Sequence, residues 1–62
     1  MKPEEKIFLQ GYVCALVQLI YQQDGRTSAT DELFRWKIQS IDRAKEAGCI
    51  AHDINVLIQY YG

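Results

Sequence analysis

The stretch that decides the fold is IFLQGYVCALVQLIYQQ, residues 7–23, which carries no formal charge along its whole length. Its apolar side chains recur at the spacing of a helix. A proline and two glutamates precede it, and both residue types favour a helix N-terminus. Asp24-Gly25 follows, and glycine is the usual residue just beyond a helix C-terminus. We therefore expect a first helix over residues 4–23 that ends at Gly25.

This helix is apolar on nearly every side. At about 100° per residue, apolar side chains leave only one narrow strip, which holds Gly11, Ala15, Gln18 and Gln22. A helix that is apolar nearly all round is buried nearly all round. The rest of a 62-residue chain is too short to cover it, so we expect a second copy of the chain to do so.

The strip is the expected oligomer interface. Gly11 and Ala15 are small enough to let another helix approach closely. Gln18 and Gln22 can hydrogen-bond across a two-fold axis and fix the register of the two copies. The alternative is that the strip faces solvent and Gly11 is merely tolerated there.

Two further helices complete the expected fold. The second spans residues 30–47, with Ser28 or Thr30 as its N-cap and Gly48 as its end. The third spans residues 53–61 and follows a short connector. We therefore expect one all-α domain over residues 1–62, an antiparallel helical hairpin with a short third helix, assembled as a homo-oligomeric helical bundle.

Composition and charge exclude several classes of protein. A net charge of −1 offers no basic face for nucleic acid and no polybasic signal for anionic lipid. The first helix is near the lower length limit for spanning a bilayer, and glutamines interrupt it. The first residues, MKPEEK, lack the positive segment of a signal peptide. We expect a cytoplasmic protein with neither nucleic acid nor membrane as a partner.

The residues that carry chemistry are too few for an enzyme or a metal site. Cys14, Cys49 and His52 fall short of the four ligands of a structural zinc site. In a hairpin the two cysteines would lie ~13 Å apart at ~1.5 Å per residue, beyond the ~7 Å of a disulfide, so we expect both to be small buried apolar groups. His52 adjoins Asp53, but neighbours on a connector do not make an oriented catalytic pair. We expect no metal, no cofactor and no catalysis.

A tryptophan on the second helix suggests a binding function. Trp36 lies roughly opposite the expected core face, with Arg43 two turns away on the same side, and exposed Trp and Arg are common in binding hot spots. The leading hypothesis is a non-enzymatic protein that binds a protein partner stoichiometrically through Trp36, Arg35, Arg43, Tyr60 and Tyr61. The alternative for Trp36 is a boundary side chain packed against the third helix or a second copy.

In size, charge and helical content, the chain is similar to small accessory proteins of phages and other mobile elements. That resemblance implies an accessory or inhibitor protein that acts by binding a host component. Two other hypotheses remain open. One is an oligomeric binder of an anionic, nucleotide-like small ligand, held by Tyr12, Tyr21, Arg26 and Tyr60. The other is a purely structural oligomer.

Overall fold

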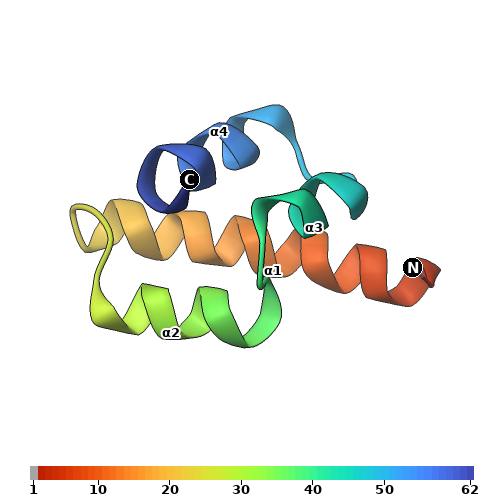
Figure 1. The fold of residues 1–62 in the computed structure, drawn as a ribbon, viewed down its shortest axis with the longest axis horizontal. Helices are drawn as coiled ribbons and strands as arrows, with labels where there is room; N and C mark the ends of the chain where they lie inside the picture. Colours follow the sequence, from red (N-terminus) through yellow and green to blue (C-terminus); the bar gives the residue numbers. More distant parts are fainter. Residues whose placement is uncertain (1) are drawn as a thin grey trace.

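The computed structural model describes residues 2–62, and all regular secondary structure in this range is α-helix (Figure 1). Its helices are α1 (Pro3–Gln22), α2 (Ser28–Lys37), α3 (Ile41–Glu46) and α4 (Ala51–Tyr61). The all-α class expected from the sequence is therefore confirmed, with four helices in place of three.

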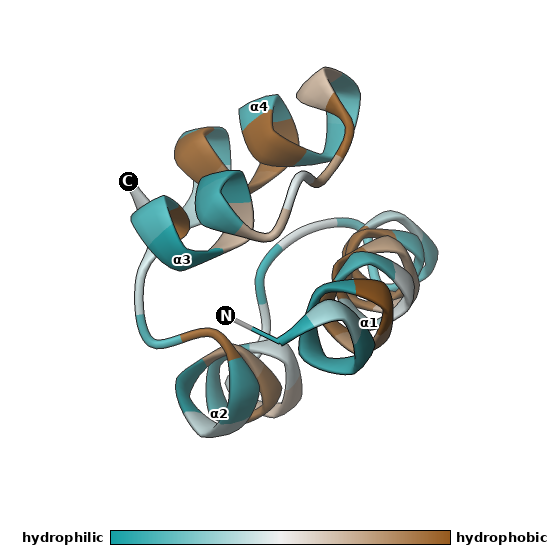
Figure 2. Cartoon of the chain, turned by 90° about the vertical axis from the view of Figure 1, so that its right-hand side faces the viewer, coloured by the Kyte–Doolittle hydropathy of each residue, from teal (hydrophilic) through white to brown (hydrophobic). Residues whose placement is uncertain are grey.

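Helix α1 is the element against which the others pack. It contacts α2, α3 and α4, and α3 also contacts α4. Viewed end-on, the other three helices all lie to one side of α1 (Figure 2). The core forms on that inner side and consists of Leu9, Val13, Leu16, Val17, Ile20, Ile38, Ala44, Ala47, Ile54, Val56 and Leu57.

The second helix expected from the sequence is divided in two. The chain leaves α2 at Ile38, whose backbone departs from the helical conformation (φ −127°, ψ 88°) and whose side chain is completely buried. Ser40 then caps α3, because its hydroxyl accepts a hydrogen bond from the Arg43 amide at 3.4 Å. The expectation of one helix over residues 30–47 is wrong, since turning the chain at Ile38 lets α3 cross back over α1 and bury Ala44.

The N-cap of α2 also differs from the expectation. Thr27, rather than Ser28 or Thr30, is the cap, and its hydroxyl accepts a hydrogen bond from the Thr30 amide. The Thr30 hydroxyl in turn accepts from the Thr27 amide at 2.8 Å, which completes a reciprocal capping box. Both side chains thereby satisfy amides that a helix start leaves without partners.

Gly48 ends α3 as expected. Its φ of +82° is left-handed, and the amide of Cys49 reaches back to the carbonyl of Ala44 at 3.2 Å, the pattern of a glycine-terminated helix. Gln10 of α1 adds a long-range bond there, because its side-chain amide donates to the carbonyl of Ala47 at 2.8 Å. This bond ties α1 to the end of α3.

Helix α1 is not buried nearly all round by its own chain. Only its inner stripe is buried, while Ile7, Cys14 and Tyr21 on the outer side are exposed. The expectation that both cysteines are buried is wrong for Cys14, and Cys49 is half-buried. The total surface of 4203 Å² is close to the ~4,100 Å² of a folded 7.2 kDa monomer. The chain therefore forms a compact fold alone and still leaves one side of α1 uncovered.

None of the helices within residues 2–62 has both the length and the apolar character that crossing a membrane requires.

Candidate functional site

The exposed apolar side chains gather mainly on α1 and α2. Of the seven large ones, five lie on these two helices and two lie near or on α4; they are Ile7, Phe8, Tyr21, Leu33, Trp36, Ile50 and Ile58. Trp36 is the most exposed of them, at 74%. The α1–α2 groove is the surface between these helices lined by Phe8, Tyr12, Leu33, Trp36 and Lys37.

Trp36 reaches the surface because of how α2 meets α1. Thr30 of α2 is completely buried and Phe34 is half-buried, so these residues form the inner face of the helix. Leu33 and Trp36 are one turn apart, and both are exposed on the side that borders α1. The tryptophan is therefore held at the rim of the groove by a helix whose other face is anchored in the core.

The α1 side of the groove is built from stacked aromatic rings. Phe8 and Tyr12, four residues apart on α1, lie with ring centroids 5.9 Å apart and an interplanar angle of 26°. The Lys37 ammonium lies 5.2 Å from the centre of the Phe8 ring, within the range of a cation–π contact. These contacts fix the two rings that face the tryptophan side of the groove.

A hydrogen bond joins the two walls. The Tyr12 hydroxyl donates to the backbone carbonyl of Leu33 at 2.9 Å. Burial raises the pKa of Tyr12 above its ordinary value, because the phenolate would be poorly solvated there. The neutral phenol therefore stays in place as the donor across the ordinary pH range.

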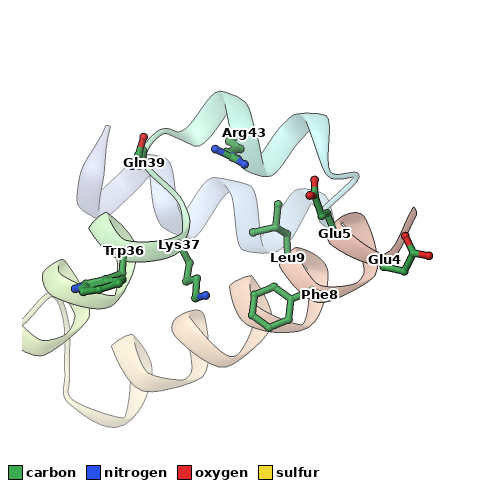
Figure 3. Close-up of a pocket in the computed structure, with 8 residues that line it drawn as sticks. All are labelled: Glu4, Glu5, Phe8, Leu9, Trp36, Lys37, Gln39 and Arg43. Carbon is green, nitrogen blue, oxygen red and sulfur yellow. The ribbon is translucent and has the colours of Figure 1, made fainter. Parts of the chain in front are cut away.

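Two hollows open on either side of Trp36 and Lys37, which line both of them. The first has a volume of 390 Å³ and is lined by Glu4, Glu5, Phe8, Leu9, Trp36, Lys37, Gln39 and Arg43 (Figure 3). The second has a volume of 570 Å³ and is lined by Tyr12, Ala29, Glu32, Leu33, Trp36 and Lys37. Each is large enough to receive one or two side chains of a partner.

Charge in the first hollow is divided between its ends. Trp36 and Lys37 lie toward one end and Glu4 toward the other, with Phe8 between them (Figure 3). Arg43 of α3 forms the wall opposite Phe8. A partner that fills this hollow would meet the Lys37 ammonium beside the tryptophan, Arg43 on the wall opposite Phe8 and a carboxylate at the far end.

The structure brings together only part of the predicted partner-binding set. Trp36 and Arg43 line the same hollow. Arg35 lies on the other side of Trp36, in a third, polar hollow that Trp36 also lines and that does not include Arg43.

The two C-terminal tyrosines are internal contacts. The Tyr61 ring stacks on Phe34 with centroids 4.3 Å apart, and the Arg26 guanidinium lies 5.3 Å above Tyr61. The backbone carbonyl of Tyr60 accepts a hydrogen bond from Arg26 at 2.8 Å. Both tyrosines are half-buried, so they support the fold near α2.

The four residues predicted for an anionic ligand do not converge. Tyr12 faces α2, whereas the Tyr21 hydroxyl lies 3.3 Å from His52 of α4. Arg26 forms an ion pair with Asp31 at 2.8 Å. It also donates a hydrogen bond to the backbone carbonyl of Tyr60, so Tyr60 meets Arg26 through its backbone. Their arrangement does not form one anion site among residues 2–62.

A row of polar groups that the sequence did not suggest joins α1 to α4. His52 Nε2 lies 3.3 Å from the Tyr21 hydroxyl, and His52 Nδ1 lies 3.3 Å from the carboxylate of Asp53. Asp53 is buried, whereas Tyr21 and His52 are exposed. His52 and Asp53 are therefore oriented relative to each other, and the row holds the start of α4 against α1.

All four residues of the predicted oligomer strip are exposed on α1; they are Gly11, Ala15, Gln18 and Gln22. A Cβ atom at Gly11 would meet no atom within 4 Å. The fold of one copy therefore does not explain the glycine.

Within residues 2–62 no three His, Cys, Asp or Glu side chains are grouped so that they could hold a metal ion. The chain matches no protein-family model, and neither a curated protein nor a solved structure matches it.

Proposed function

We propose that this chain is a non-enzymatic binding protein that associates stoichiometrically with a protein partner through the α1–α2 groove. The observation that carries the proposal is Trp36, which is 74% exposed between two hollows. An exposed indole of this size leaves a large apolar area in water, and such side chains are frequent binding hot spots.

The groove favours a partner that presents a short apolar segment, such as one face of an amphipathic helix. Grooves between two helices receive such segments through side chains spaced along one face. The two hollows provide places for those side chains, and Leu33 and Phe8 provide the apolar floor around them. Lys37 favours an acidic group beside the tryptophan, Arg43 favours one against the opposite wall, and Glu4 favours a basic group at the far end.

An accessory or inhibitor role of the phage type, in the cytoplasm, is part of the same proposal. It rests on the small size, the near-neutral charge and the helical content of the chain. Binding by simple association would suit such a role.

The test compares capture of a partner by three forms of the chain. The wild type, Trp36→Ala and the matched control Ile58→Ala, which removes an exposed side chain of α4, are immobilised and exposed to extract of the source cells. Native mass spectrometry then reports the mass and copy number of each complex. We expect one species in defined stoichiometry with the wild type and the control, and none with Trp36→Ala.

A second variant separates loss of binding from loss of fold. Leu33→Asp places a charge in the floor of the groove at a position that is already exposed, so helical circular dichroism should remain. Retention of the partner by both folded groove variants would contradict the proposal. A melting temperature raised by nucleotides in the absence of any protein would favour the small-ligand hypothesis instead.

A further inference from the structure

Among residues 2–62, Lys37 is the one charged side chain that lines both hollows of the α1–α2 groove. Its ammonium lies 5.2 Å from the centre of the Phe8 ring. Phe8 lines the first hollow, and Tyr12, one turn further along α1, lines the second. The two hollows therefore follow each other along the groove at a spacing of ~6 Å, with Lys37 at the boundary between them.

No carboxylate among residues 2–62 forms an ion pair with Lys37. The ion pairs in this range join Arg26 to Asp31 and His52 to Asp53. Lys37 is exposed, so water solvates its ammonium while the groove is open.

An occupant of the groove changes the surroundings of this charge. A segment that fills both hollows passes over Lys37, because Lys37 borders both. The segment thereby removes water from the ammonium, and a charge that loses its water without gaining a partner is strongly unfavourable. The occupant must therefore bring an acidic group to this point.

We propose that Lys37 is the specificity-determining residue of the groove, and that it selects an amphipathic helix of the partner protein with a carboxylate beside two apolar side chains one turn apart. This inference rests on the proposed function, because it concerns the occupant of the same groove. The two apolar side chains enter the two hollows, since residues i and i+4 of a helix also lie ~6 Å apart along its axis. The Asp or Glu of the partner pairs with Lys37 between them.

The position of the carboxylate in the partner helix follows from the same geometry. At about 100° per residue, the side chains at i+1 and i+3 lie on opposite sides of the line through i and i+4. One of the two faces α2, which carries Lys37, and reversing the direction of the helix exchanges them. The motif is therefore apolar-acid-x-x-apolar for one direction and apolar-x-x-acid-apolar for the other.

The carboxylates on either side of Lys37 favour basic residues at both ends of the occupant. Glu4 lines only the first hollow and Glu32 only the second, so the charges along the groove run negative, positive, negative. Glu5 and Arg43 also line the first hollow, and their opposite charges leave the sign of that end to Glu4. A segment with a single sign of charge would place like charges together in at least one hollow, so the groove disfavours it.

The first experiment selects peptides from a displayed library of random sequences of about 16 residues, long enough to form a helix. The immobilised chain is the wild type, Lys37→Glu or the matched control Lys45→Glu, which reverses an exposed lysine of α3 that lines neither hollow. The wild type and the control should enrich the acidic motif. Lys37→Glu should instead enrich lysine or arginine at the same position.

The second experiment measures affinities with synthetic peptides that lack tryptophan. Trp36 is the single tryptophan of the chain, so its fluorescence reports occupation of the groove. The enriched acidic peptide should bind Lys37→Glu about tenfold or more weakly than the wild type, and replacing its acid by lysine should restore binding to that variant. Helical circular dichroism of Lys37→Glu should be unchanged, because the side chain is exposed.

Trp36→Ala separates failure of this inference from failure of the proposed function. Peptides that require Trp36 but show no preferred charge, or that bind Lys37→Glu as tightly as the wild type, would overturn the role of Lys37 and leave the groove as a binding site. Peptides that bind Trp36→Ala as well as the wild type, or a selection that enriches no peptide, would contradict both proposals.

Discussion

The ring of Tyr61 lies flat on the ring of Phe34, with centroids 4.3 Å apart and an interplanar angle of 6°. This contact joins the last turn of α4 to α2, two helices that are separated by α3 along the chain. It closes the fold on the side of α2 that faces away from the α1–α2 groove.

Tyr61→Ala should lower the free energy of unfolding by about 2 kcal/mol, because aromatic truncation removes burial and stacking. Tyr21→Ala is the matched control, since that ring is exposed, and it should cost well under half as much. Urea denaturation followed by helical circular dichroism measures both. Equal losses for the two variants would show that the stack contributes little.

Two neighbouring hydroxyls at the start of α2 should differ in their effect on stability. Thr27→Ala removes the cap that accepts from the Thr30 amide, and loss of such a cap costs about 1 kcal/mol. Ser28→Ala replaces an exposed side chain in the first turn and should change the free energy of unfolding by less than about 0.5 kcal/mol. The reverse order in thermal denaturation would contradict the assignment of Thr27 as the cap.

Two glycines should respond to alanine with opposite signs. Gly48→Ala should destabilise by about 1 kcal/mol or more, because its left-handed backbone disfavours a Cβ atom, which would also lie 3.2 Å from Gln10 Nε2. Gly11→Ala should stabilise the fold by up to about 1 kcal/mol, since space is open there. Melting temperatures of the two variants and the wild type give the two signs directly.

Stability should fall in alkali. Burial raises the pKa of Tyr12, of Tyr61 and of Cys49 above their ordinary values, and Asp53 raises that of Cys49 further. The unfolded chain therefore loses these protons at lower pH than the folded chain does, so the free energy of unfolding decreases once pH exceeds the unfolded values, about 8.5 for cysteine and about 10 for tyrosine.

Tyr12→Phe tests the tyrosine contribution to this decline. The variant should lose some stability at neutral pH, where the bond to Leu33 is missing, and should decline less steeply above pH of about 10. Tyr21→Phe removes an exposed hydroxyl and serves as the control for the substitution. An unchanged slope for Tyr12→Phe in denaturation curves across this pH range would contradict the role of burial at Tyr12.

The sequence predicts the helical class and the extent of α1 well, because a charge-free helical repeat is bounded there by proline and by Asp24-Gly25. It does not predict the break between α2 and α3. Phe34, Ile38 and Ile41 continue a helical repeat through the break, and Ser40 is followed three residues later by Arg43 rather than by the Glu or Gln of a recognisable capping box. The turn depends on burial of Ile38, which is a property of the packed core.

The groove was predictable only in part. Trp36 could be identified from its place opposite the expected core face. Phe8 and Lys37 could not, because their meeting depends on how α1 and α2 align in space. The internal contacts of Tyr60 and Tyr61 could not be predicted either, because the return of the end of α4 toward α2 leaves no local pattern of residues.

The burial of Thr30 and Ile38 has a consequence for the thermodynamics of binding. Both side chains are completely buried, one near each end of α2, and Trp36 lies only two positions before Ile38. The backbone that carries the tryptophan is therefore ordered before any partner arrives, so association immobilises little more than the indole side chain itself. A preorganised surface of this kind keeps the entropic cost of complex formation low, which favours the proposed association of a 62-residue chain through a small area.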